Sequence, residues 1–193
     1  MIRQEPAFSE LRIVSGESLV DIRRDRTIDI ALRYGPGCHG AGVHAERLWP
    51  TGAIIAVCAP EVARDPALRS PVDLHRQILL RTAPPDSGWQ TWLAAASVPV
   101  GGAMRKALEG PVFGTSQLAI EAAASGRGIA LAPAVLVERD IATGRLVRLF
   151  STSLADPNAF WLLCRADRAR EARLRAFTKW VRQEAARTEA AVS

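Results

Sequence analysis

One run of sequence, residues 112–133 (VFGTSQLAIEAAASGRGIALAP), carries the signals for a strand, a helix and a second strand in close succession. The apolar pair Val112 and Phe113 predicts the end of a strand, and the glycine after it lets the backbone turn. Thr115 or Ser116 then caps a helix, because a short hydroxyl side chain accepts a hydrogen bond from an unpaired N–H group of the first turn. The helix therefore starts directly beyond the strand.

The same run predicts where this helix ends and which element comes next. The helix begins at Gln117 and stops where Gly126 supplies a left-handed residue, and Ile129–Ala132 has the continuous apolar character of a buried strand. Because the first N–H groups of the helix carry the positive end of its dipole, its start suits a ligand carboxylate or hydroxyl. A plain structural cap is the alternative interpretation of the two hydroxyl residues.

The rest of the chain alternates strand and helix patterns. Gly35-Pro36-Gly37 is a strong stop after a strand, and Ser70-Pro71-Val72-Asp73 has the residues of a capped helix start. The predicted strands are residues 11–14, 28–34, 53–59, 78–80, 146–150 and 160–164, and the predicted helices are about 16–24, from 70 onward, 89–96, 134–142 and 168–187. Residues 38–45 are expected to form a loop and 151–158 a polar connector. Such alternation predicts an α/β fold with mainly parallel sheets.

Composition and charge favour a globular protein without membrane segments. Of the 193 residues, 48% are hydrophobic and 23% charged, and no run of 18 apolar residues occurs. The first six residues lack the apolar core of a signal peptide, so we expect a cytoplasmic location. The net charge of +5 comes from dispersed arginines. Their densest stretch, residues 165–187, has its apolar residues on one helix face, which predicts a solvated amphipathic helix rather than a DNA-reading one.

Reactive groups are few, so we expect no enzyme activity, no cofactor and no metal. There is no nucleophile elbow, no H-E-x-x-H helix and no phosphate-binding loop of the Walker A type. His39 and His44 lie near Cys38 in a glycine-rich loop, and a solvated loop explains them better than a metal site does. An enzyme that uses Cys58 or Cys164 as a nucleophile is the weaker hypothesis, because both lie in apolar strand-like runs.

A second candidate site lies at the end of the strand at residues 28–34. In open α/β sheets the carboxyl ends of the strands present ligand-binding side chains, and Arg33 and Tyr34 occupy such an end. The arginine could pair with a carboxylate and the tyrosine could stack or donate a hydrogen bond. An ordinary surface ion pair for Arg33, with Tyr34 packed under the glycine turn, is the alternative.

These segments together resemble the effector-binding domain of LysR-type transcriptional regulators, and in particular the glycine-cleavage-activator-like subgroup. No single motif decides the resemblance, but the shared order and spacing along essentially the whole chain are specific. The matching segments are residues 19–22, 28–35 (IDIALRYG), 56–60, 89–93, 122–133 (AAASGRGIALAP), 144–147, 160–164 and 176–181.

The resemblance implies a type 2 periplasmic-binding-protein-like fold: two doubly wound α/β lobes joined by two crossover strands, with an effector in the cleft between them. Lobe I would be residues 1–59 with 157–193, and lobe II residues 60–156. Effector contacts would come from Arg33, Tyr34, Thr115, Ser116 and Phe160. Because the subgroup commonly has tyrosine at the position of Phe160, a hydrogen-bond donor to the effector would be missing there.

The front of the chain departs from the family pattern. Relatives begin with a helix-turn-helix and the first strand and helix of lobe I, whereas here residues 1–6 lead straight into the strand expected at 11–14. The resemblance therefore implies an N-terminally truncated fold that does not bind DNA by itself. The missing strand would be a central one, so residues 11–14 would lose their partner and expose apolar side chains.

The leading hypothesis is therefore the effector-sensing and dimerising domain of a LysR-type regulator, which binds a small, carboxylate-bearing molecule. Its partners would be that effector and either a second copy or intact LysR-type relatives, with DNA contacted only through a helix-turn-helix absent from this chain. The alternative is a stand-alone small-molecule binding protein of the same fold with no role in transcription.

Overall fold

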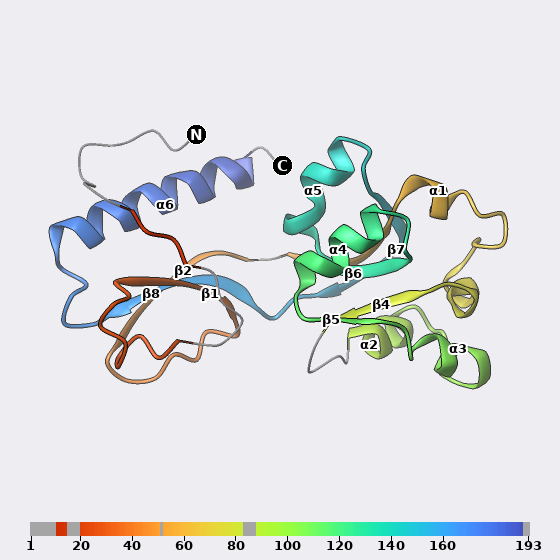
Figure 1. Cartoon of the computed structure of the whole chain (residues 1–193), viewed down its shortest axis with the longest axis horizontal. Coiled ribbons are helices and arrows are strands. Elements are labelled where there is room, and N and C mark those ends of the chain that lie inside the picture. The colour runs from red at the N-terminus through yellow and green to blue at the C-terminus, as the bar shows by residue number, and fades with distance from the viewer. Residues whose placement is uncertain (1–10, 15–19, 51, 83–87, 191–193) are drawn as a thin grey trace. The chain divides into compact units, whose positions relative to one another are not determined.

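The computed structural model describes residues 11–14, 20–50, 52–82 and 88–190 (Figure 1). The chain divides into two compact units, residues 1–50 with 157–193, and residues 51–156. The lobe boundary expected at residues 59 and 60 lies further along the chain than this division. The difference arises because the strand at residues 53–58 is hydrogen-bonded entirely within the second unit. The assignment of lobes stays a prediction.

The first unit contains a three-stranded antiparallel sheet. Its strands are β1 (Ile30–Gly35), β8 (Ala159–Arg165) and β2 (Val43–Pro50), in the order β1-β8-β2. The last strand of the chain is thus central and holds the two earlier strands together. Leu162 and Leu163, in its middle, are almost completely buried on opposite faces of the sheet.

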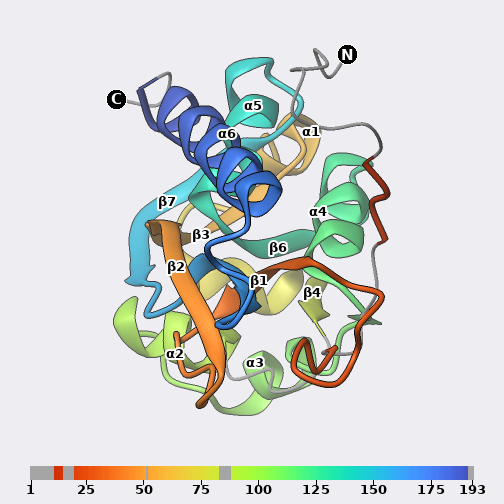
Figure 2. The same ribbon diagram turned by 90° about the vertical axis from the view of Figure 1, so that its left-hand side faces the viewer.

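One face of this sheet is covered by helix α6 (Ala172–Ala190), which lies on one side of the strands in Figure 2. Of the helix side chains that the structure describes, Leu174, Val181 and Ala185 are buried, in keeping with the amphipathic pattern. Arg182 forms an ion pair with Glu46 of β2. The arginine-rich stretch is therefore part of a surface helix packed on the sheet.

The second unit is built around a five-stranded mixed sheet in the order β5-β4-β6-β3-β7. Strands β5 and β6 run parallel to β4, whereas β3 is antiparallel to both of its neighbours, β6 and β7. Its strands are β3 (Ala53–Cys58), β4 (Leu79–Thr82), β5 (Val112–Phe113), β6 (Ile129–Pro133) and β7 (Val147–Ala155). Its helices are α1 (Pro60–Ala63), the 3-10 helix η1 (Pro71–Arg76), α2 (Gly88–Ala95), α3 (Gly102–Ala107), α4 (Ser116–Ala124) and α5 (Ala134–Ala142).

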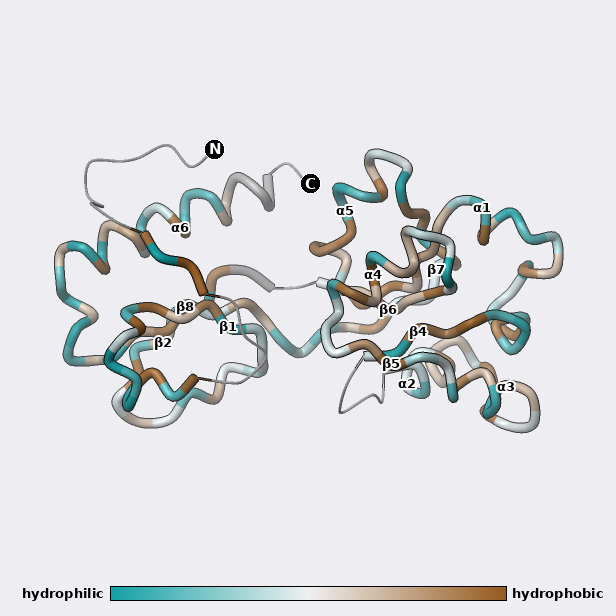
Figure 3. The backbone as a smooth tube through the Cα atoms, in the orientation of Figure 1, coloured by the Kyte–Doolittle hydropathy of each residue, from teal (hydrophilic) through white to brown (hydrophobic). Residues whose placement is uncertain are grey.

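Apolar layers cover both faces of this sheet, and Figure 3 shows the hydrophobic residues concentrated along its strands. In β3, Ile55 and Val57 belong to the core beneath α4 and α5, and Ala56 and Cys58 belong to the core beneath α2, α3 and η1. Alternate residues of one strand therefore support two separate cores, as the continuous apolar run predicts.

Strand β7 contains a large bulge opposite β3. Ser153 pairs with Ile55, but the next residue of β3, Ala56, pairs with Leu149, so residues 150–152 have no partner on β3. Phe150 has a φ of 62°. The Arg148 guanidinium donates hydrogen bonds to the carbonyl oxygens of Phe150 and Ser151, at 3.2 and 2.7 Å, and so holds the extra residues in place.

Several predictions of local structure are confirmed and others are wrong. The predicted helix at 134–142 and strand at 129–132 are present. The prediction of mainly parallel sheets is wrong, because the first unit's sheet and both pairings of β3 are antiparallel. The prediction of a polar connector at residues 151–158 is wrong in part, since β7 continues to Ala155. The loop predicted at residues 38–45 is shorter than expected, because β2 begins at Val43.

The front of the chain also differs from the prediction. Residues 11–14 form no strand, and Leu11, Ile13 and Val14 are 42%, 75% and 71% exposed, as expected for residues without a partner strand. The helix predicted at 16–24 falls partly outside the described residues, and the described part, 20–24, contains a turn. Within the described ranges, no helix has the length and apolar character needed to span a lipid bilayer.

Gly128, between α4 and β6, provides a test of how closely α4 is joined to the sheet. Its φ is 148°, and a Cβ placed there would lie 2.3 Å from the carbonyl oxygen of Ile78. We predict that Gly128→Ala lowers the free energy of unfolding by about 3 kcal/mol, through backbone strain and the clash. Chemical denaturation measures this change.

The matched control is Gly144→Ala. Gly144 also has a positive φ, 72°, but nothing lies within 4 Å of a Cβ placed there. Its substitution should cost about 1 kcal/mol, from the left-handed conformation alone. Equal losses for the two variants would show that the close approach to Ile78 is unimportant.

Candidate functional site

The start of α4 is the candidate site with the most specific local geometry. Thr115 is the N-cap, with an extended backbone (φ −136°, ψ 155°), and its hydroxyl oxygen accepts a hydrogen bond from the backbone N–H of Leu118 at 3.3 Å. Of the two predicted caps, Thr115 is the one used. The helix therefore begins at Ser116, one residue before the predicted start.

Ser116 differs from its neighbour in that its hydroxyl is not used by the helix. Among the described residues, the Ser116 side chain has no hydrogen-bond partner. The backbone N–H groups of Ser116 and Gln117 occupy the first two helical positions, where no intrahelical acceptor exists. One hydroxyl and two N–H donors are thus grouped at the positive end of a nine-residue helix.

The other end of α4 fixes the helix on the sheet. Gly126, with a φ of 70°, ends it in a Schellman motif in which the N–H of Arg127 donates to the carbonyl of Ala122 at 3.0 Å. Ala119, Ile120 and Ala123 are buried in the core beneath the helix. Because the helix is short and held at both ends, its first turn is presented rigidly.

Tyr34 and Phe160 are brought together by the sheet of the first unit. They are directly opposite each other in the β1–β8 pairing, and their ring centroids lie 5.6 Å apart at an angle of 49°. The Asn158 side chain donates a hydrogen bond to the Tyr34 hydroxyl oxygen at 3.0 Å. Tyr34 remains 43% exposed, so this aromatic pair offers a partly open apolar surface with a polar edge.

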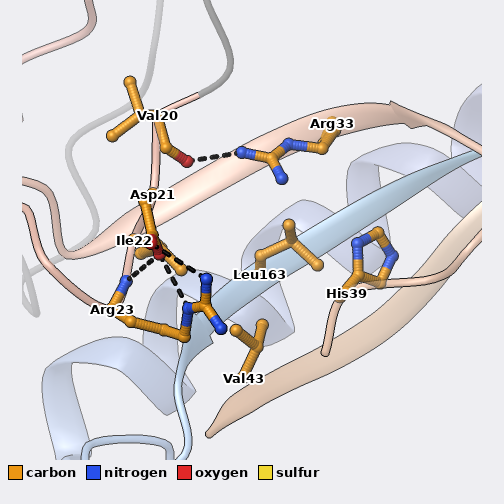
Figure 4. Close-up of a pocket in the computed structure, with 8 residues that line it drawn as sticks. All are labelled: Val20, Asp21, Ile22, Arg23, Arg33, His39, Val43 and Leu163. Atoms are coloured by element: carbon orange, nitrogen blue, oxygen red, sulfur yellow. Dashed lines mark hydrogen bonds and ion pairs between the residues drawn. The ribbon is translucent and has the colours of Figure 1, made fainter. Parts of the chain in front are cut away.

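Arg33 is not grouped with that pair. Neighbouring residues of a strand point to opposite faces, so Arg33 shares a face with Trp161, its partner on β8, rather than with Tyr34. Its Nη2 donates a hydrogen bond to the carbonyl oxygen of Val20 at 2.6 Å, within the same unit (Figure 4). The surface ion pair of the alternative interpretation is therefore absent among the described residues, and the role of Arg33 toward an effector stays a prediction.

His39 is not the solvated loop residue that its glycine-rich surroundings predict. Its ring packs edge-on against Trp161, with centroids 5.1 Å apart. His44 lies in β2 opposite Cys164, on the other face of the sheet from Trp161, so the two histidines diverge. Across the residues that the structure describes, no three His, Cys, Asp or Glu side chains are grouped as a metal ion requires.

The two cysteines considered as nucleophiles are buried. Burial raises the pKa of the Cys58 thiol to about 12, helped by the nearby Glu61 carboxylate. Burial also raises the pKa of the Cys164 thiol. Because the thiolate is the reactive form, neither residue has the environment of a catalytic cysteine.

Comparison with known proteins decides the family. The model of the LysR substrate binding domain matches residues 2–186. The chain belongs to this family. The activator AmpR of Pseudomonas aeruginosa is 34% identical over 93% of the chain, and the glycine cleavage system transcriptional activator of Escherichia coli K12 is 32% identical over 86% of it. The chain spans 57% and 54% of these two relatives, which are transcriptional regulators.

Solved structures agree with this assignment. The effector domain of P. aeruginosa AmpR superposes on this LysR substrate-binding domain with a TM-score of 0.76 and 33% identity, covering 94% of this chain and 83% of the other. The AmpR effector binding domain of Citrobacter freundii, at 23% identity and a TM-score of 0.69, shares the fold; the match covers 87% of this chain and 81% of that one. The α/β fold of the type 2 periplasmic-binding-protein class is thereby confirmed.

The two hydroxyls at the start of α4 should differ in what they do for stability. We predict that Thr115→Ala lowers the free energy of unfolding by about 1 kcal/mol, because it removes the cap. Ser116→Ala should change it by less than about 0.5 kcal/mol. Denaturation of both variants checks this, and Thr115→Ser should retain most of the wild-type stability. A larger loss for Ser116→Ala would mean that Ser116 is the structural residue.

Thiol accessibility tests the enzyme hypothesis directly. Of the 3 cysteines, only Cys38 is exposed in the structure. We predict that an aromatic disulfide reagent modifies one thiol per folded chain and all three after unfolding, and that Cys38→Ser abolishes the native-state reaction. Rapid reaction of the Cys38→Ser variant in its folded state would revive Cys58 or Cys164 as a nucleophile.

Proposed function

We propose that this chain is the effector-sensing and dimerising part of a LysR-type transcriptional regulator, that it acts in the cytoplasm, and that it neither catalyses a reaction nor binds DNA by itself. Membership of the family and the likeness to AmpR effector domains support the sensing role. Family membership indicates which domain of a regulator this chain is. The chemical class of the effector has to be argued from the residues of the chain itself.

The proposed effector is a small molecule with a carboxylate. The observation that carries this proposal is the start of α4, where Thr115 is occupied as the cap and the Ser116 hydroxyl is left beside two unpaired backbone N–H groups. Such a helix start favours an anionic oxygen through both hydrogen bonds and the helix dipole. The arrangement leaves the helix intact when the ligand leaves, because the cap is a different residue.

We propose that the first unit contributes the Tyr34 and Phe160 pair to the same effector. Their packing gives an apolar surface, and phenylalanine at position 160 offers no hydroxyl to the ligand. Contacts from both units would make effector affinity depend on how the units are arranged. A ligand shifts a conformational equilibrium only through such a difference in affinity, and this difference would be the signal passed to the rest of the regulator.

A thermal-shift screen of amino acids and small carboxylates against the whole chain tests the proposal. A ligand at about 100 times its Kd stabilises the folded protein by about 2.7 kcal/mol, so binders should raise the melting temperature clearly. We predict that Ser116→Ala weakens binding of the best compound at least tenfold while its own unfolding free energy stays near the wild-type value.

The matched control is Ser125→Ala, which removes a hydroxyl from the opposite end of the same helix. In the structure this hydroxyl donates to the carbonyl of Glu121 at 2.9 Å, at the C-terminal end of α4. The Ser125→Ala variant should bind the compound as tightly as the wild type does. If no carboxylate stabilises the protein, or if Ser116→Ala binds as tightly as Ser125→Ala, the α4 start is not the effector site.

A further inference from the structure

The two outer edges of the second unit's sheet differ in length. In the described part of the chain, one edge is β5, with 2 residues, and the other is β7, with 9. An edge strand carries N–H and C=O groups that can pair with a strand of another chain. A strand as short as β5 offers little for such pairing, whereas β7 is longer than a typical strand. The edge that needs protection is therefore β7.

The sequence of β7, VRLFSTSLA, favours pairing with another chain. It contains five apolar residues, three hydroxyl residues and one charged residue, Arg148, and it has neither proline nor glycine. Segments with strong strand propensity, low net charge and no proline are those that most readily form sheets between chains. The composition of β7 alone thus leaves this edge open to a second copy of the chain.

The bulge divides this edge into two short pieces. Residues 147–149 pair with β3 at 56–58 and residues 153–155 pair with it at 53–55, while residues 150–152 have no partner on β3. A bulge bends the strand and increases its twist, so a straight incoming strand can follow only one piece at a time. Each piece has three residues, about half the length of a typical strand.

Arg148 occupies the acceptors that the bulge offers. Its side chain is exposed, and its guanidinium donates to the carbonyl oxygens of Phe150 and Ser151 at 3.2 and 2.7 Å. A strand from another chain would have to displace a charged side chain to reach these two oxygens. Charged side chains on an edge strand are a common protection against pairing between chains.

The bulge has a second role, in the core, which can be separated from the first. Phe150 has a φ of 62°, and this left-handed conformation costs about 1–2 kcal/mol in a residue other than glycine. The Phe150 ring packs against Trp92, with centroids 6.1 Å apart. That contact concerns the core, whereas the two hydrogen bonds of Arg148 concern the exposed backbone. Substitutions can therefore remove one role and leave the other.

We propose that the β7 bulge, residues 150–152, together with Arg148 blocks the addition of a strand from a second copy of the chain to the outer edge of this sheet. The device lies within the second unit and uses no residue of α4, so it does not depend on the effector site proposed above. In a chain that also dimerises, a closed edge confines association to other surfaces.

Deletion of residues 150–152 tests the proposal, because it joins Leu149 to Ser153 and keeps the pairing of both with β3. In sedimentation velocity, the folded deletion variant should form larger species than the wild type at equal concentration. The amides of β7 should exchange more slowly with solvent in those species. The matched control is Phe150→Ala, which also loses the aromatic ring but keeps the bulge, and it should sediment as the wild type does. A folded deletion variant that sediments like the wild type, or equal association of Phe150→Ala, overturns the proposal.

Arg148→Thr tests the guanidinium separately from the bulge. It uncovers the two carbonyl oxygens without changing the chain length, so the constant for self-association should rise at least threefold. Arg139→Thr is the control, since it removes the same charge from an exposed position of α5. It should sediment as the wild type does. Wild-type sedimentation of Arg148→Thr overturns the role assigned to Arg148 and, where the deletion variant does not fold, the proposal as a whole.

Discussion

The structure of the second unit depends on the burial of β3 on both faces. Its alternate residues enter two different cores: Ile55 and Val57 support α4 and α5, whereas Ala56 and Cys58 support α2, α3 and η1. This double burial fixes the register of β6 and β7 on either side, because a slip by one residue would exchange the two sets. The position of α4, and with it the candidate effector site, depends on that register.

Much of α4 and its surroundings could be predicted from the sequence because the signals there are local. A hydroxyl N-cap, a left-handed glycine and an apolar run act within a few residues, and Thr115, Gly126 and β6 are found where these signals place them. The choice between Thr115 and Ser116 needed the structure, since both have the same chemistry. The direction of the strands could not be predicted from the sequence, because an apolar run is buried equally well in parallel and antiparallel ladders.

The surroundings of His39 in the first unit could not be predicted from the sequence, for a different reason. His39 lies in a segment rich in glycine, which indicates a loop but does not show which residues pack against it. Only the return of β8 between β1 and β2 brings Trp161 to the histidine. Long-range strand pairing of this kind depends on contacts between residues more than one hundred positions apart in the chain, such as Arg33 and Trp161.

The bulge in β7 has a consequence for how this sheet tolerates changes of length. Leu149 and Leu154 are separated by an odd number of positions, and a regular strand would turn them to opposite faces. Both instead contribute to the core beneath α2, because the three unpaired residues, 150–152, shift the alternation by an odd count. Removal of all three would leave the two leucines two positions apart and still on one face of the strand, so this sheet can lose the whole insertion and keep both leucines inside. What evolution has to preserve at this point is the pairing of Leu149 and Leu154 with β3, rather than the length of the segment between them.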